Sequence, residues 1–122
     1  MRYYSRKDSS NNLEDEIFIK SDSSLVKLKL NNIIYIEALE NYVTINTNEE
    51  KYTIHFTMKS IENQLPSDIF KRIHRSYIVN INMIKTINET YLDIIVNGTF
   101  KNLPIGSSFR ELLRKNINVL EK

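Results

Sequence analysis

The residues best suited to chemistry lie in one short segment, which reads F-K-R-I-H-R-S-Y from Phe70 to Tyr77. It interleaves basic side chains with aromatic ones and adds a histidine and a serine. Arg, His and Ser presented on a strand or loop suit contacts with phosphate oxygens and with base edges in a nucleic-acid groove. An exposed edge strand that carries Lys and Arg against aggregation would show the same composition. The segment therefore predicts either a nucleic-acid contact or a protected sheet edge.

Catalysis by these residues is a weaker interpretation. His74 could act as a general base only beside a nucleophile or an orienting carboxylate, and its sequence neighbours supply neither. His55, the other histidine, lies in an alternating segment and suits a structural role. Glu37 and Glu40 resemble the carboxylate pair of glycoside hydrolysis, but Asn41 beside them is typical of a bend between strands. A bend is the interpretation we favour.

The composition excludes most common enzyme sites. The 122-residue chain has no Cys, which excludes disulfides, thiolate nucleophiles and cysteine-ligated metals. Its two glycines, Gly98 and Gly106, cannot form a dinucleotide-binding turn or a Walker phosphate loop. Its two histidines are too far apart for an H-E-x-x-H zinc site. We therefore expect a protein that is not an enzyme and that uses no cofactor and no metal.

The charge distribution favours an anionic partner. The net charge is only +2, but residues 70–122 carry nine Lys and Arg against four Asp and Glu. Such an asymmetry between halves is common in domains that bind a polyanion. No apolar run approaches the ~18 residues of a membrane span, and the first residues lack the apolar stretch of a secretory signal. A cytoplasmic protein without membrane contact is expected.

The pattern of apolar residues predicts one mainly β domain. Residues 1–15 are polar and suit a flexible tail or interdomain linker, and residues 16–122 form the folded part. Alternating apolar residues rich in Ile, Val, Thr and Tyr indicate short strands. The expected strands are 16–20, 25–30, 33–38, 42–46, 51–56, 70–74, 76–80, 84–87, 91–96 and 99–103.

Two helices are expected. The first spans 58–65, with Thr57 as its cap, an apolar stripe on one side and Pro66 as its stop. The stripe consists of Met58, Ile61 and Leu65. The second opens at Ser108, where Ser108 and Glu111 form a capping box. Its expected apolar face consists of Phe109, Leu112, Leu113, Ile117 and Leu120. The free N–H groups at its start would attract phosphate.

Taken in order, these segments resemble the LytTR DNA-binding domain of bacterial response regulators of the LytR/AlgR type. The resemblance spans about residues 16–120. It rests on I-I-Y-I-E-A at 33–38 running into N-Y-V at 41–43, on the helix at 58–66, and on L-P-I-G-S-S-F at 103–109. The most specific part is the F-x-R-x-H-R-S-Y-x-V-N string at 70–80.

The resemblance implies an elongated, mostly antiparallel β domain, the output domain of a two-component transcriptional regulator. Such domains read bases in the major groove of double-stranded DNA through loops rather than a recognition helix. By position, the base-reading residues are Asn41 and Tyr42 beside Glu40, then His74, Arg75 and Ser76, and then Ser107 after Gly106. The phosphate-binding residues are Lys71, Arg72, Tyr77, Lys101 and Arg110. Arg75 is expected to contribute most to base readout.

One position departs from the family pattern. Many members carry P-V-S-R-S-Y at the third loop, and Ser107 stands here in place of that arginine. A serine cannot make the bidentate guanine contact of an arginine, which discriminates by ~1–3 kcal/mol. The third contact is therefore expected to be weaker, directed at phosphate, or shifted to Lys101 or Arg110.

The resemblance also implies partners. Family members commonly bind as two copies on direct repeats, and an N-terminal receiver domain usually precedes the DNA-binding domain. Because residues 1–15 cannot hold a receiver, the chain is either a fragment that begins in the linker or a stand-alone regulator.

Two other binding functions are the alternatives. The first is a β-sheet protein-interaction module that pairs its strand edges with a partner peptide and has no DNA specificity. The second is a binder of single strands or RNA that stacks bases on exposed tyrosines.

Overall fold

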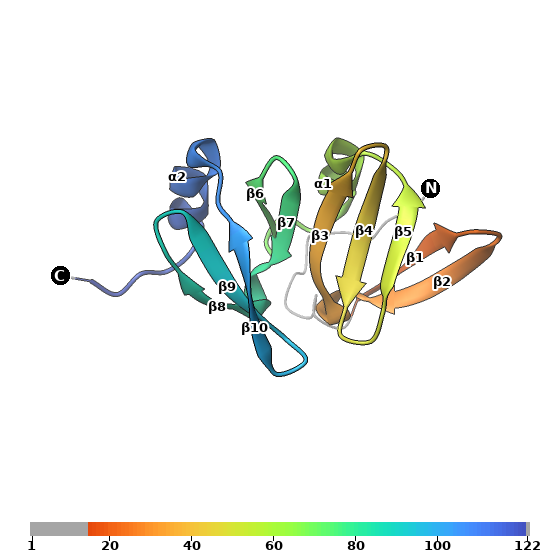
Figure 1. Ribbon diagram of the computed structural model, residues 1–122, viewed down its shortest axis with the longest axis horizontal. Helices are drawn as coiled ribbons and strands as arrows, with labels where there is room; N and C mark the ends of the chain where they lie inside the picture. The colour runs from red at the N-terminus through yellow and green to blue at the C-terminus, as the bar shows by residue number, and fades with distance from the viewer. Residues whose placement is uncertain (1–14, 122) are drawn as a thin grey trace.

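The computed structural model describes residues 15–121, which contain ten antiparallel strands and two α-helices (Figure 1). The strands are β1 (Glu16–Ser21), β2 (Ser24–Lys29), β3 (Ile33–Leu39), β4 (Tyr42–Thr47), β5 (Lys51–His55), β6 (Phe70–His74), β7 (Tyr77–Asn80), β8 (Ile84–Ile87), β9 (Tyr91–Val96) and β10 (Thr99–Pro104). The helices are α1 (Met58–Gln64) and α2 (Ser107–Lys115). Single 3-10 turns at Leu30–Asn32 and Ile81–Met83 follow β2 and β7. The predicted mainly β domain is confirmed, and each predicted strand lies within one residue of the observed one.

The strands form three sheets that lie side by side along the long axis of the molecule (Figure 1). The central sheet has five strands in the order β5-β4-β3-β7-β6. The β1–β2 hairpin flanks it on one side, and a three-stranded sheet of order β10-β9-β8 flanks it on the other. The molecule is therefore elongated, as the family resemblance implies.

The middle of the central sheet is buried on both faces. Ile36 of β3 and Ile78 of β7 are register partners in one core cluster, which includes residues of the hairpin and α1. The neighbouring partners, Tyr35 and Val79, belong to a second cluster with residues of the three-stranded sheet and α2. A strand buried on both faces needs a nearly continuous apolar run. The run Ile33–Ile36 at the start of β3 meets this need.

Asn80 is fully buried at the end of β7 and joins three segments. Its amide Nδ2 donates to the carbonyl oxygen of Ile33 at 2.9 Å, and its Oδ1 accepts from the backbone N–H of Asn82 at 2.9 Å. Burial of an amide is tolerated when its polar atoms are hydrogen-bonded in this way. The asparagine in the V-N pair of the 70–80 string is thus a structural residue that links β7 to the start of β3.

The first predicted helix is confirmed and the second is partly wrong. The Thr57 side chain accepts from the Ser60 N–H at 3.1 Å, and Met58, Ile61 and Leu65 are all buried. Helix α2, however, begins at Ser107, with Gly106 at the N-cap and no side-chain capping bond. The predicted start at Ser108 with a Ser108–Glu111 capping box is therefore wrong.

Helix α2 begins earlier than predicted because the chain before it contacts β6. The Gly106 N–H donates to the Ile73 carbonyl oxygen at 2.8 Å, which fixes the chain two residues before the predicted cap at Ser108. The apolar face of α2 also contains fewer residues than predicted. The helix ends at Lys115, before Leu120, and the side chains of Leu112 and Leu120 are exposed. Leu113 is its buried residue.

The domain boundary stays a prediction. The predicted tail, 1–15, lies outside the described residues except for Asp15, whose carbonyl oxygen accepts from the Leu30 N–H at 2.9 Å.

Asn80→Ala should lower the free energy of unfolding by about 1–3 kcal/mol, because it leaves the Ile33 carbonyl and the Asn82 N–H without their buried partner. Asn82→Ala removes an exposed side chain two residues away and should change stability by less than about 0.5 kcal/mol. Urea unfolding followed by circular dichroism compares the two. Equal stability of both variants would contradict the structural role of Asn80.

Candidate nucleic-acid interface

The three predicted DNA-reading loops lie at one long edge of the molecule (Figure 1). They are the β3–β4 turn at 40–41, the β6–β7 turn at 75–76 and the β10–α2 junction at 105–106. We call this the turn edge. The β4–β5 and β9–β10 turns point to the opposite edge (Figure 1). The structure therefore brings together loops that are far apart in the sequence, as the resemblance implies.

The β6–β7 turn presents Arg75 to solvent. The Ser76 N–H donates to His74 Nδ1 at 3.0 Å, so the imidazole proton lies on Nε2, which can donate to a ligand. The Ser76 carbonyl oxygen accepts from the Ala38 N–H at 2.9 Å. This bond ties the turn to the end of β3, directly before the β3–β4 turn.

The β3–β4 turn is tight and exposed. Glu40 adopts a left-handed backbone with φ 52°, and Asn41 is exposed beside it. Tyr42 is 47% exposed, and its ring meets His55 edge to face with centroids 5.1 Å apart. The prediction of a bend at Glu40 is confirmed, and it places an amide and a phenol where a ligand can reach them.

The β10–α2 junction packs directly against β6. A Cβ atom on Gly106 would lie 3.1 Å from Cδ2 of Phe109 and 3.7 Å from Cα of His74. A side chain here would be crowded because of this close approach and not because of the backbone, whose φ is −71°. Ser107, the first residue of α2, is exposed. The second and third loops are therefore held in contact.

The predicted phosphate-binding residues differ in whether their side chains already contact other groups of the protein. Lys71 is half-buried, and Lys101 is exposed with Nζ 5.8 Å from the centre of the Tyr35 ring. Arg110 donates to the carbonyl oxygen and to Oε1 of Glu89, at 2.8 and 3.3 Å. That contact holds Arg110 at the loop between β8 and β9.

Tyr77 and Arg72 have protein partners of their own. The Tyr77 hydroxyl donates to Glu37 Oε2 at 3.2 Å, and burial together with the Glu37 carboxylate raises the pKa of Tyr77. Arg72 forms an ion pair with Glu62 of α1 at 2.7 Å. Sequence reasoning assigned no role at the site to either glutamate, because both contacts join elements whose pairing no local spacing reveals. The roles of all these side chains toward DNA stay predictions.

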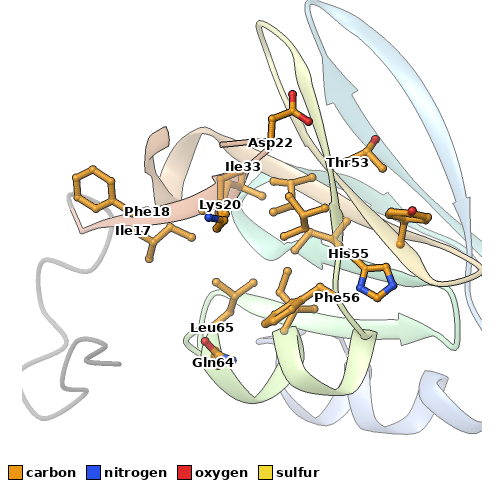
Figure 2. Close-up of a pocket in the computed structure, with 16 residues that line it drawn as sticks. Ile17, Phe18, Lys20, Asp22, Ile33, Thr53, His55, Phe56, Gln64 and Leu65 are labelled. Carbon is orange, nitrogen blue, oxygen red and sulfur yellow. The ribbon is translucent and has the colours of Figure 1, made fainter. Parts of the chain in front are cut away.

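A cavity of about 630 Å³ lies between β1, β5 and α1 (Figure 2). Most of its wall is apolar, with Ile17, Phe56 and Leu65 among the lining residues. Tyr42 and His55 also line it. The cavity therefore extends from the first core cluster to the start of β4, next to the β3–β4 turn.

The part of the chain that the structure describes offers neither a metal site nor a membrane-spanning helix. No group of three or more His, Asp or Glu side chains there could hold a metal ion. None of the helices within 15–121 has the length and apolar character needed to cross a bilayer.

Comparison with known families decides the identity of the domain. The sequence model described as the LytTr DNA-binding domain matches residues 23–118. The chain belongs to the LytTr DNA-binding domain family. Membership confirms the resemblance drawn from the sequence and, with it, DNA binding as the class of function. The LytTr family is a DNA-binding family and not an enzyme family.

Relatives of this LytTr domain include a sensory transduction protein and a transcriptional regulatory protein. Sensory transduction protein LytT of Bacillus cereus is 32% identical over 102 residues, which cover 80% of this chain and 41% of that protein. Transcriptional regulatory protein LytR of Staphylococcus aureus (strain N315) is 33% identical over 117 residues, which cover 93% of this chain and 47% of that protein. The chain thus spans less than half the length of these relatives.

A solved structure supports the LytTr fold. The LytTr DNA-binding domain of a methyl-accepting/DNA response regulator from Bacillus cereus superposes with a TM-score of 0.69 at 26% sequence identity. The superposition covers 83% of this chain and 94% of that chain. The arrangement of sheets and helices is therefore that of a LytTr domain.

Gly106→Ala should lower the free energy of unfolding by about 1 kcal/mol, because the added methyl group crowds the half-buried Phe109 ring. The amide resonances of His74 should shift with those of Phe109, since both residues border the added atom. Ser107→Ala alters an exposed neighbour and should leave stability within about 0.5 kcal/mol. Shifts confined to α2 in the Gly106 variant would contradict the contact between the two loops.

Proposed function

We propose that this LytTr domain reads a specific double-stranded DNA sequence by placing the loops of its turn edge in successive major grooves. The observation that carries the proposal is that the three loops share one edge and are joined by backbone hydrogen bonds through Ala38–Ser76 and Ile73–Gly106. Loops fixed in this way can meet a rigid duplex without first being ordered, which lowers the entropic cost of binding.

Arg75 carries the main base contact in this proposal. Its side chain is exposed at the tip of the β6–β7 turn and makes no ion pair within residues 15–121. A free guanidinium can bind guanine O6 and N7 together. The other proposed base-reading residues are Asn41, Tyr42, His74, Ser76 and Ser107.

Phosphate contacts would come from Lys71 and Lys101, whose ammonium groups form no ion pair with the described residues. Arg110 would join them only by giving up Glu89, and Tyr77 only by sharing the hydroxyl that it donates to Glu37. Contacts of this kind fix the position of the protein on the duplex and carry no sequence information.

The wider context is part of the same proposal. We place the domain in a cytoplasmic response regulator, in which residues 1–15 act as a linker from a receiver domain and two copies bind direct repeats. The names of the relatives, a sensory transduction protein and a transcriptional regulatory protein, support this context. Their lengths, more than twice the aligned region, support it as well.

Fluorescence anisotropy against duplexes selected from a random pool tests the proposal. A sequence reader should bind a selected duplex at least ~10³-fold more tightly than scrambled DNA, and log affinity should fall linearly with log salt. Equal, weak binding to every duplex would contradict the proposal and favour a protein-interaction module. A preference for single strands would favour the stacking alternative.

Arg75→Ala should weaken binding to the selected duplex by about 1–3 kcal/mol and relax the preference at one base position. Lys71→Ala should instead weaken binding to selected and scrambled duplexes alike, because a phosphate contact is independent of sequence. Repeating the selection with each variant measures the difference. Unchanged affinity and unchanged preference in Arg75→Ala would refute the assignment of the base contact.

A further inference from the structure

Arg72 directs its whole guanidinium toward the protein. Nε donates to the His74 carbonyl oxygen at 2.9 Å, and Nη2 donates to the Arg75 carbonyl oxygen at 2.6 Å. Nη1 donates to Glu62 Oε1 at 2.7 Å. The side chain is only 18% exposed. Its three nitrogens thus bind two consecutive carbonyls of the β6–β7 turn and one carboxylate of α1.

The ladder between β6 and β7 is irregular just before the turn that Arg72 contacts. Arg72 pairs with Ile78 and His74 pairs with Tyr77, so one residue of β6 is extra. A bulge of this kind disrupts the ladder and leaves backbone groups without strand partners. The Arg72 guanidinium adds bonds to the carbonyls of His74 and Arg75, the two residues that follow the extra residue of β6. It therefore sets the direction in which the tip of the turn points.

Arg72 also reaches the third loop. Its guanidinium carbon lies 5.9 Å from the centre of the Phe109 ring of α2. The Ile73 carbonyl oxygen, one residue along β6, accepts from the Gly106 N–H. A cation over an aromatic face is attractive at this distance. One side chain thus contacts α1, the β6–β7 turn and α2.

We propose that Arg72, held by Glu62, is a positioning residue that fixes the second and third DNA-reading loops relative to each other, and that it does not bind phosphate. This proposal rests on the proposed function and replaces the phosphate-binding role that the family resemblance implies for Arg72. It makes sequence discrimination depend on Glu62, a residue of α1 whose negative charge would repel DNA. It also explains why the basic residue at position 72 is an arginine, since the ammonium of a lysine could not form this three-way fork.

Three variants of the 122-residue chain separate positioning from phosphate binding. They are Arg72→Gln, Glu62→Gln and, as the matched phosphate contrast on the same strand, Lys71→Gln. Affinity for the selected and scrambled duplexes is measured by anisotropy across a salt series. Each phosphate contact that is lost should make the slope of log affinity against log salt shallower by about 0.9.

Arg72→Gln should lower affinity for the selected duplex about tenfold, as expected for the loss of charge-assisted hydrogen bonds, and leave the salt slope unchanged. Lys71→Gln should weaken both duplexes and reduce the slope. Glu62→Gln should weaken the selected duplex although it removes a negative charge. A reduced slope in Arg72→Gln, or tighter binding to all DNA in Glu62→Gln, would overturn the proposal.

Hydrogen exchange in the absence of DNA tests the clamp independently of the proposed function. Arg72→Gln should speed exchange of the Ser76 amide, which is bonded to His74, at least about tenfold. The amides of Ile36 and Ile45 in the central strands should keep their protection. Unchanged exchange at Ser76 would refute the clamp even if the wild-type chain bound no DNA. Absence of duplex preference in the wild-type chain, with faster exchange in the variant, would refute the proposed function alone.

Discussion

Strands β3 and β7 bury side chains on both faces of the central sheet, and this double burial determines where the other elements lie. Ile36 and Ile78 require cover from the hairpin and α1, whereas Tyr35 and Val79 require it from the three-stranded sheet and α2. Fully burying such a side chain contributes roughly 1.5–3 kcal/mol. The three sheets therefore lie in one row, and the loops that leave them share one edge (Figure 1).

That edge is ordered mainly by backbone bonds and by internal side-chain contacts. The bonds Ala38–Ser76 and Ile73–Gly106 join neighbouring loops through main-chain atoms. Because main-chain atoms hold the loops together, exposed side chains such as Arg75 and Ser107 can differ between relatives without loss of the arrangement. Ser107 is an example, since an exposed side chain at the first turn of α2 contributes to the surface and not to the packing.

The strands were predictable from the sequence because alternation and β-branched residues act locally, and the turn at Glu40 was predictable from Asn41 beside it. The start of α2 was not, because the contact between Gly106 and Ile73 joins segments more than thirty residues apart. The same holds for Arg72. Its spacing marked it as one basic residue among several, while its pairing with Glu62 depends on how α1 packs beside β6. For the candidate site, the sequence predicted the loops but not which basic side chains are bonded to other groups of the protein.

The central claim is that the turn edge is the DNA-binding surface. Titration of the ¹⁵N-labelled chain with a selected duplex, followed by amide chemical shifts, tests it most directly. The largest changes should fall at 40–42, 74–76 and 106–108. The turns at 48–49 and 97–98 on the opposite edge should change little, and they serve as the internal control. Changes concentrated in those two turns, or in the β1–β2 hairpin, would contradict the account.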